Sequence, residues 1–226
     1  MNWKAVLFDA TGTLIELREP VALSYARFAR AHGIDLPSRR IDEAWKRVVS
    51  GRELRCFPNA RPEDVPGLER AWWHEVVRAT FRASDSSIVF PDFDAFFGDL
   101  FEWYATAEAW RTCPGVETTL ARLRDTGLRL GVISDFDYRL TDVRDSLGIA
   151  DLFDAVGLAG PVGATKPDPR LFAAALAAMG LSQRDAVYVG DDPARDLAGA
   201  EAAGLASVDV ASLESFTDLP NRLATL

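Results

Sequence analysis

The chain of 226 residues is poor in cysteine and histidine. Its two cysteines, Cys56 and Cys113, lie far apart and have no metal-type spacing, and its only histidines are His32 and His74. This pattern excludes a disulfide framework and a cysteine-rich zinc module. We therefore expect two free thiols in a reducing compartment, and histidines with structural roles.

Positive charge is also scarce, since lysine occurs only at Lys4, Lys46 and Lys166 and the formal net charge is −9. A phosphate backbone or an anionic membrane needs a basic face, so we expect no nucleic acid and no membrane as a partner. A small anionic substrate responds to the local field inside a cleft and is not excluded. Because the chain nearly avoids lysine, Lys166 in a predicted strand-end loop is a candidate functional residue.

Apolar runs of about 18 residues, the length that crosses a membrane, do not occur. No charged start is followed by a short apolar segment, so we expect a cytoplasmic protein without a secretory signal. With 48% hydrophobic and 26% charged residues, the composition is that of a globular protein with a sizeable core. The length fits one large domain, or a core with a smaller appended unit.

A short apolar run over residues 6–8 ends abruptly at Asp9 and is followed by a turn that contains threonine and glycine. The run is too brief for a helix and predicts a buried parallel strand. In open α/β sheets, ligands bind in the crevice outside the carboxyl ends of the strands. Asp9 is therefore the residue around which we expect the site to be organised.

Predicted strands alternate with helices in the second half of the chain, which indicates a parallel sheet with right-handed crossovers. The predicted strands cover residues 4–8, 128–133, 155–158, 186–190 and 205–210. The predicted helices cover residues 116–124, a segment that follows Ser134 and Asp135 and runs to about 147, and residues 169–179 and 193–203.

Helical periodicity replaces this pattern between the first strand and residue 111. Helices are predicted over residues 20–31, 38–50, 67–83 and around 93–101. The predicted fold is α/β, a Rossmann-like three-layer core with a parallel sheet (1–15 and 112–226) plus an inserted α-helical cap (16–111). Five of the six tryptophans lie in the insertion, where we expect aromatic side chains to form core rather than to contact substrate.

Polar clusters follow the predicted strands: Asp9 with Thr11 and Thr13, Ser134 with Asp135, Lys166, and Asp191 and Asp192 with Asp196. Carboxylates gathered at one sheet edge repel one another unless a cation lies between them, and hard oxygen ligands suit Mg²⁺. Lys166 adds a compact positive charge, and Ser134 lies where the N-terminus of a following helix can hold an anion. A carboxylate nucleophile, a cation, a lysine and an anion-binding position together favour phosphoryl transfer through an aspartyl-phosphate, on a small phosphorylated metabolite.

Four motifs in this order resemble the haloacid dehalogenase (HAD) superfamily: FDATGTL (8–14), ISDFD (133–137), KPDP (166–169) and VGDD (189–192) with Asp196. The insertion between the first two resembles the helical cap of subfamily IA. Residues 134–140 are similar to the haloacid dehalogenase-like hydrolase domain-containing 3 type. Each motif alone is weak, whereas four in order, over essentially the whole chain, are specific.

The resemblance implies a role for each motif. Asp9 is implied to be the nucleophile, and Lys166 to bridge it and the developing charge. Phosphate-binding roles are implied for Thr13, Ser134 and the backbone amide of Asp135. The implied Mg²⁺ ligands are Asp9, the backbone carbonyl of Thr11, Asp191, and Asp192 and Asp196 directly or through water.

Thr11 departs from the pattern of the superfamily's phosphatases, which carry a second aspartate there to protonate the leaving oxygen and later activate water. A hydroxyl is not an acid or base near neutral pH, and this role commonly contributes about 10²–10⁴-fold. The P-type ATPases, which resemble this site in their D-x-T-G-T pattern, and the haloacid dehalogenases also lack the acid and use good leaving groups. We therefore expect better activity on acyl, aryl or anhydride phosphates than on sugar phosphates.

Simpler roles stay open for several of these residues. Ser134 and Asp137 form a candidate capping box, and Asp192 before a proline is a candidate N-cap. Asp196 lies in a predicted first helical turn, where the helix dipole favours an acidic residue. In the insertion, three arginines are candidates to reach over the cleft: Arg52, Arg55 and Arg61.

Two rival functions also stay open. A metal-independent 2-haloacid dehalogenase would use Asp9 as an alkyl-accepting nucleophile, but Asp191 and Asp192 argue against it because that chemistry needs no cation site. A protein that has lost the acid would bind a phosphorylated ligand or a protein partner without turnover. Specificity is expected to lie in cap loops, and the sequence carries no signal for the oligomeric state.

Overall fold

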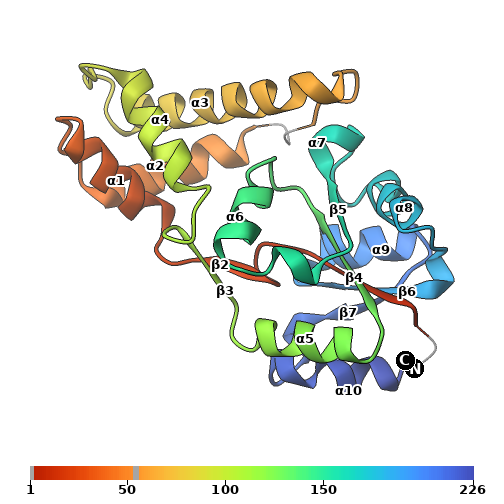
Figure 1. The fold of residues 1–226 in the computed structure, drawn as a ribbon. Helices are drawn as coiled ribbons and strands as arrows, with labels where there is room; N and C mark the ends of the chain where they lie inside the picture. The colour runs from red at the N-terminus through yellow and green to blue at the C-terminus, as the bar shows by residue number, and fades with distance from the viewer. Residues whose placement is uncertain (1–2, 53–55) are drawn as a thin grey trace.

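A five-stranded parallel sheet in the order β5-β4-β1-β6-β7 forms the centre of the computed structural model, which describes residues 3–52 and 56–226 (Figure 1). The strands are β1 (Ala5–Phe8), β4 (Arg129–Ser134), β5 (Ala155–Leu158), β6 (Ala186–Gly190) and β7 (Ala206–Asp209). The predicted α/β class is confirmed. Across the described residues, none of the helices combines the length and apolarity that crossing a membrane requires.

Strand β1 lies in the middle of the sheet, and all of its residues are apolar and buried. It pairs in parallel with β4 on one side and β6 on the other, so that Phe8 lies beside Val132 and Val189. The carboxyl ends of three strands therefore meet at one edge of the sheet. The polar residues that follow these strands are brought together there.

Helices cover both faces of the sheet, which confirms the three-layer core (Figure 1). Alternate residues of β1 divide between the two faces, with Phe8 in one apolar cluster and Leu7 in the other, as the strand period of two requires. One layer contains α5 (Val116–Asp125), α6 (Leu140–Ser146) and α10 (Leu219–Ala224). The other contains α8 (Pro169–Ala178) and α9 (Ala198–Ala202).

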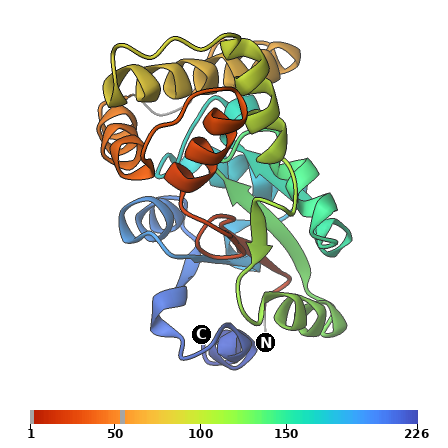
Figure 2. The ribbon, with the colours of Figure 1, turned by 90° about the vertical axis from the view of Figure 1, so that its left-hand side faces the viewer.

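The inserted helices pack on one another as a separate layer, seen at the top of Figures 1 and 2. They are α1 (Val21–Ala31), α2 (Ser38–Ser50), α3 (Val65–Ser84) and α4 (Phe93–Trp103). Their shared apolar cluster is largely aromatic: it includes Tyr25, Phe81, Phe96, Phe97 and Phe101. A helical insertion is therefore present, as predicted.

A second, two-stranded sheet, which the sequence pattern does not predict, connects the insertion to the core. Its strands, β2 (Ile15–Leu17) and β3 (Trp110–Thr112), pair antiparallel, with Ile15 opposite Thr112. Three residues are too few to show a strand period. Short helical turns complete the fold: η1 (Pro62–Asp64), η2 (Ala150–Leu152), α7 (Ala159–Val162), η3 (Gln183–Asp185), the π-helical η4 (Pro193–Leu197), η5 (Val210–Ser212) and η6 (Phe216–Asp218).

Helix α6 begins at Leu140 and not directly after Ser134 and Asp135, so the predicted helix start is wrong. The backbone amide of Tyr138 donates to the Glu69 carboxylate (3.0 Å), and that of Arg139 donates to the Asp137 carboxylate (3.0 Å). Side-chain acceptors thus take the place of helix carbonyls in the intervening turn.

Candidate active site

Asp9 lies at the end of β1, in a tight loop that returns on itself through hydrogen bonds from the amides of Leu14 and Ile15 to the Ala10 carbonyl (2.8 and 2.9 Å). Gly12 in this loop has φ +92°, and a Cβ there would lie 2.8 Å from the Asp191 Cγ. Only glycine combines this backbone conformation with so close an approach. The loop therefore brings the first motif against the last.

Lys166 joins the two acidic parts of the site. Its Nζ donates to Asp9, to Asp196 (2.6 Å) and to the Tyr188 hydroxyl (3.3 Å). The Tyr188 hydroxyl in turn donates to Asp196 (2.7 Å). The Lys166 backbone amide donates to the Asp135 carboxylate (3.0 Å), which fixes the loop that carries the ammonium. Lys166 is buried, unlike an ordinary surface lysine.

Three carboxylates form the acidic cluster: oxygens of Asp9, Asp191 and Asp196 lie within 4.8 Å of one another. Asp196 accepts the backbone amides of Asp191 (3.2 Å) and Asp192 (3.1 Å). Thr13 is buried and donates its hydroxyl to Asp191 (3.1 Å). Of the predicted metal ligands, these three aspartates are brought together.

Charge in this cluster is unbalanced. Burial raises the pKa of the Asp9 carboxyl to about 7, against the lowering effect of the Lys166 ammonium, and burial also raises the pKa of Asp191. For Lys166, burial is outweighed by Asp9 and Asp196, so its pKa is raised and it stays charged. For Asp196, burial is outweighed by Lys166 and by donated hydrogen bonds, so its pKa is lowered. Three carboxylates thus face one ammonium, which leaves negative charge for a cation.

Asp192 has a different environment, because its carboxylate caps η4 by accepting the amides of Ala194 (2.9 Å) and Arg195 (3.1 Å). It lies outside the group formed by the three clustered aspartates. Asp135, besides holding the Lys166 amide, pairs with the Arg195 guanidinium. The capping role left open for Asp192 is present, and a role in metal binding stays a prediction.

Ser134 ends β4 and is buried, and its hydroxyl accepts the amide of Phe136 (3.1 Å). It does not lie at a helix N-terminus, since α6 begins six residues later at Leu140. The capping box considered for Ser134 and Asp137 does not describe this turn, because the Asp137 carboxylate instead accepts the Arg139 amide. Ser134 nevertheless lines the same cavity as Asp9 and Lys166, and its role in phosphate binding stays a prediction.

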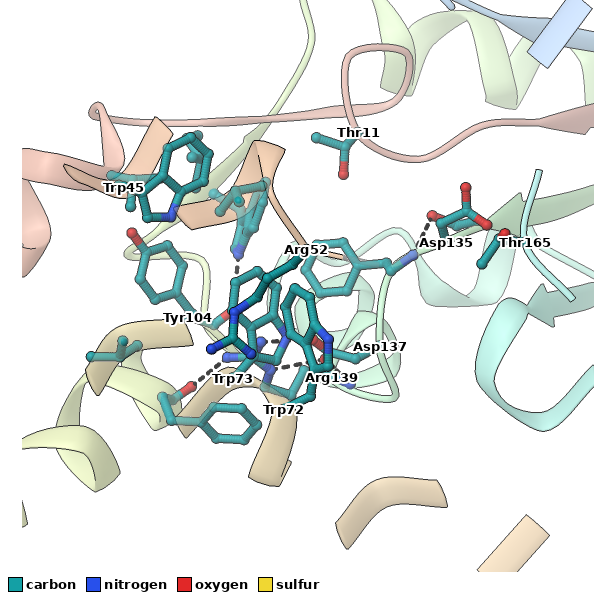
Figure 3. A pocket seen from close by; sticks show the side chains of 18 of the residues that line it. Thr11, Trp45, Arg52, Trp72, Trp73, Tyr104, Asp135, Asp137, Arg139 and Thr165 are labelled. Atoms are coloured by element: carbon teal, nitrogen blue, oxygen red, sulfur yellow. Dashed lines mark hydrogen bonds and ion pairs between the residues drawn. The ribbon is translucent and has the colours of Figure 1, made fainter. Parts of the chain in front are cut away.

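A cavity of about 440 Å³ lies between the strand ends and the inserted helices (Figure 3). Thr11 and Asp135 lie toward one end of it in Figure 3, and Trp45, Trp73 and Tyr104 lie toward the other. The acidic cluster, Ser134 and Lys166 therefore line one cavity together with side chains of the insertion.

Sequence reasoning missed the aromatic residues of this cavity. Trp45, Trp72, Trp73 and Trp110 were expected to form core rather than to contact substrate. Trp45, Trp73 and Trp110 do pack in the apolar clusters, and all four also line the cavity. The signal was the concentration of tryptophan in the insertion, which helical periodicity alone assigns to packing. The same expectation holds for Trp103, which packs against Phe28 and is not among the lining residues described.

Of the three candidate arginines, Arg52 lines the cavity and donates to the Glu75 carbonyl (3.3 Å). Arg61 pairs with Asp64 (2.8 Å) away from the cavity. Arg55 lies outside the described residues. The two histidines are half-buried and pair with Asp99 and Asp94, and both cysteines are free, as predicted.

A buried polar network links the insertion to the core beside the cavity. Asp137 accepts the Trp73 indole N–H (2.7 Å) and two guanidinium N–H groups of Arg139 (2.9 and 2.7 Å). Arg139 also donates to the Phe101 carbonyl (3.0 Å). The turn after β4 is therefore tied to both α3 and α4.

Comparison with known proteins agrees with the motifs and with the fold. The family model of haloacid dehalogenase-like hydrolases matches residues 3–204. Haloacid dehalogenase-like hydrolase domain-containing protein 3 of Mus musculus is 35% identical over 222 residues, 95% of this chain and 84% of the relative.

Solved structures of the same fold include a HAD phosphatase from Thermococcus onnurineus (TM-score 0.62, 25% identity, 97% of both chains). Another is the HAD-hydrolase YfnB from Bacillus subtilis bound to magnesium (TM-score 0.73, 16% identity, 99% of this chain and 100% of that chain). The chain belongs to the haloacid dehalogenase-like hydrolase family.

Proposed function

We propose that this hydrolase is a Mg²⁺-dependent phosphatase that uses Asp9 as its nucleophile and acts on a small phosphorylated metabolite. The observation that carries the proposal is the buried contact of Asp9 with Lys166, inside a cluster of three carboxylates that lines a cavity. The phosphatase from Thermococcus onnurineus, which shares the fold, supports the choice of reaction.

The donor set fits Mg²⁺. Asp9, Asp191 and Asp196 supply hard carboxylate oxygens within 4.8 Å of one another, and their charge exceeds that of Lys166. We assign these three as ligands, together with the backbone carbonyl of Thr11, and keep Asp192 as a ligand through water. When bound, the cation supplies neutralisation of phosphate charge.

The protein's own residues account for the chemistry. A carboxylate oxygen of Asp9 attacks phosphorus, the bond from phosphorus to the leaving oxygen breaks, and that oxygen departs with the electron pair and takes a proton from water. The Lys166 ammonium stabilises the charge on the phosphoryl oxygens, and Thr13, the Ser134 hydroxyl and the Asp135 amide orient it. Water then attacks phosphorus, releases inorganic phosphate and regenerates the Asp9 carboxylate.

Thr11 sets the range of substrates in this scheme. Its side chain is exposed and lines the cavity, where other phosphatases of the superfamily place an aspartate. Because a hydroxyl does not protonate a leaving oxygen near neutral pH, substrates whose leaving group is stable as an anion are favoured. We therefore propose acyl, aryl and anhydride phosphates over sugar phosphates.

Two units make up the enzyme in this proposal: a core, residues 1–15 and 112–226, that carries the chemistry, and a cap, residues 16–111, that excludes water from the cavity. The pairing of β2 with β3 lies at the two connections between them. Substrate selection is assigned to the cap side chains that line the cavity.

The test is the initial rate of acetyl phosphate hydrolysis by the wild type and by Asp9→Asn, each with Mg²⁺ and with excess chelator. We expect Mg²⁺-dependent turnover that the substitution abolishes. Turnover retained in excess chelator contradicts the metal-dependent scheme. No turnover by a folded wild type that binds phosphate tightly favours the second candidate, a phospho-ligand-binding protein, whose supporting observation is Thr11.

A further inference from the structure

The cavity has two chemically different ends. The strand-end side carries the acidic cluster and Lys166, whereas the insertion contributes a single charged residue to the described lining, Arg52. The paired Asp137 and Arg139 of the turn after β4 also line the cavity, against Trp73 and Phe101 of the insertion. The other insertion residues there are largely apolar or aromatic, and we call them the apolar end: Leu17, Val21, Tyr25, Trp45, Val49, Trp72, Trp73, Val77, Phe97, Leu100, Phe101, Tyr104 and Trp110.

Several polar groups of the apolar end already have partners within the protein, whereas the buried Trp45 indole N–H has no hydrogen-bond partner among the described residues. The Tyr104 hydroxyl lies 2.6 Å from the Ser24 hydroxyl, and the Trp73 indole N–H donates to Asp137 (2.7 Å). The Tyr25 hydroxyl is buried beside the Trp45 side chain, and burial raises its pKa. Hydroxyl groups of a sugar placed here would lose water and gain few partners, which disfavours such a substrate.

Aromatic side chains at the apolar end, and Phe136 beside it, instead offer ring surface with which an aromatic ligand can pack. Trp72 and Trp73 meet edge to face with their ring centroids 4.9 Å apart, and Trp110 meets Phe136 in the same way at 5.2 Å. Edge-to-face and offset stacking are the favoured contacts between aromatic rings. A volume of about 440 Å³ lies within the range of small-molecule sites lined by such side chains.

Proton donors for a leaving oxygen are also scarce among the described lining residues. The insertion contributes no aspartate, glutamate or histidine to the lining, and burial raises the pKa of Tyr104 to about 12. Thr11 supplies no acid. A leaving group that occupies the apolar end must therefore depart as a stable anion, and an aromatic oxide does so more readily than an alkoxide.

We infer that the substrate is an aryl phosphate, the phosphate monoester of an aromatic hydroxyl compound, whose ring occupies the apolar end while its phosphate meets Asp9 and Lys166. This inference rests on the proposed function and narrows its substrate class. Attack by Asp9 breaks the bond between phosphorus and the aryl oxygen, and the released aryl oxide takes a proton from water. Hydrolysis of the aspartyl-phosphate then yields inorganic phosphate.

Four substrates separate ring size from leaving-group acidity: acetyl phosphate, phenyl phosphate, 1-naphthyl phosphate and 1-naphthylmethyl phosphate. We expect kcat/KM for 1-naphthyl phosphate to exceed that for phenyl phosphate by about tenfold, since the added ring buries more apolar surface. We expect 1-naphthylmethyl phosphate, which carries the same ring on an alkyl oxygen, to be slower than 1-naphthyl phosphate by about 10² or more.

A filling variant tests the location of the ring. Val49→Trp narrows the apolar end, whereas Val48→Trp adds the same side chain at the neighbouring half-buried position of α2, outside the described lining. We expect Val49→Trp to lower the ratio of 1-naphthyl to acetyl phosphate kcat/KM by about tenfold. The ratio of Val48→Trp should equal that of the wild type.

The outcomes distinguish this inference from the function on which it rests. Absence of Asp9-dependent acetyl phosphate hydrolysis overturns the proposed function. With that hydrolysis present, equal kcat/KM values for phenyl and 1-naphthyl phosphate, or an unchanged ratio in Val49→Trp, overturn the placement of an aromatic ring. Comparable rates on 1-naphthyl and 1-naphthylmethyl phosphate overturn the requirement for an aryl oxygen.

Discussion

The Asp9 carboxyl must be ionised to act as a nucleophile, but it is also buried, and these two requirements conflict. A nucleophile must be ionised, yet burial raises the pKa of this carboxyl to about 7 even beside the Lys166 ammonium. The neighbouring Asp191 and Asp196 add negative charge to the same space. A cation relieves this repulsion, so the residues that perform the chemistry also destabilise the metal-free fold.

Restoring the acid should widen the substrate range. Thr11→Asp places a carboxyl at the position from which other phosphatases of the superfamily protonate the leaving oxygen, so we expect kcat/KM on glycerol phosphate to rise by about 10². Thr11→Asn has a similar size and no acid, and should leave that rate low. Equal rates for the two variants on glycerol phosphate would show that position 11 does not limit the reaction.

The free energy of unfolding of the metal-free protein should depend on pH through the titration of Asp9. Its pKa rises from 3.8 to about 7 on folding, so between these values the folded state binds more protons than the unfolded state. The free energy of unfolding therefore falls as the pH rises through this window, by at most about 4 kcal/mol from this group. Below pH 3.8 the Asp9 carboxyl does not lower the free energy of unfolding, and above about pH 7 its destabilising effect has its full size.

Urea unfolding in chelator at about pH 5 and about pH 7.5 measures this effect, with Asp9→Asn as the reference that lacks the titrating group. We expect the stability of the variant, relative to the wild type, to increase across this interval. A constant difference between the two proteins contradicts the assigned pKa.

At the scale of elements, alternation and periodicity in the sequence were sufficient for the parallel sheet and the inserted helices. Residues 186–190 form a buried run without charged side chains and are β6 as predicted, and α2 spans the predicted 38–50. Asp9 and Lys166 could be brought together from sequence because strand ends meet at one edge. Long-range side-chain contacts could not be predicted from the sequence. One of them explains why α6 begins later than predicted, because the carboxylate of Glu69, far away in sequence, accepts the hydrogen bond of the Tyr138 amide.

The cavity lining was unpredictable for a related reason. The same helical period that buries Tyr25 and Phe97 in the apolar cluster of the insertion also exposes part of their surface to the cavity. Periodicity identifies the buried face of a helix, but it does not say whether that face meets another helix or a ligand. The β2–β3 pair was missed because three residues carry no period.

The turn between β4 and α6 should depend on its buried ion pair. Asp137 and Arg139 have side chains only 1% and 7% exposed, so Asp137→Asn leaves a buried guanidinium without its counter-charge. We expect a loss of about 3 kcal/mol in the free energy of unfolding, measured by urea denaturation. Asp64→Asn, which breaks the exposed pair with Arg61, should cost about 1 kcal/mol or less. Similar costs for both variants would contradict a structural role for the buried pair.

At the scale of the whole molecule, the core and the insertion contribute different halves of one cavity. The sheet supplies fixed carboxylates and an ammonium at its carboxyl edge, and the helices supply apolar surface above them. Trp73 and Phe101 of the insertion form hydrogen bonds with the turn that follows β4. These bonds join the inserted helices to the part of the core that carries the acidic cluster. Ligands that bind the acidic cluster should therefore stabilise the whole chain.

Mg²⁺ should raise the free energy of unfolding of the wild type by about 2.7 kcal/mol at a concentration 100-fold above its Kd, which a thermal unfolding experiment detects as a shift of the midpoint to higher temperature. Asp191→Asn removes one carboxylate of the cluster and should reduce this shift strongly. Asp209→Asn alters an aspartate at the end of another parallel strand, β7, where it caps η5 outside the described cavity lining, and should retain the shift. Equal shifts for both variants would exclude the acidic cluster as the binding site.

The central claim, that Asp9 carries the phosphoryl group, is tested most directly by acid quenching during turnover of acetyl phosphate with Mg²⁺, followed by peptide mass mapping. The account predicts that the peptide containing Asp9 gains the mass of one phosphoryl group in the wild type, and that Asp9→Asn gains none. Steady turnover by the wild type without that mass gain, or full turnover by Asp9→Asn, would contradict it.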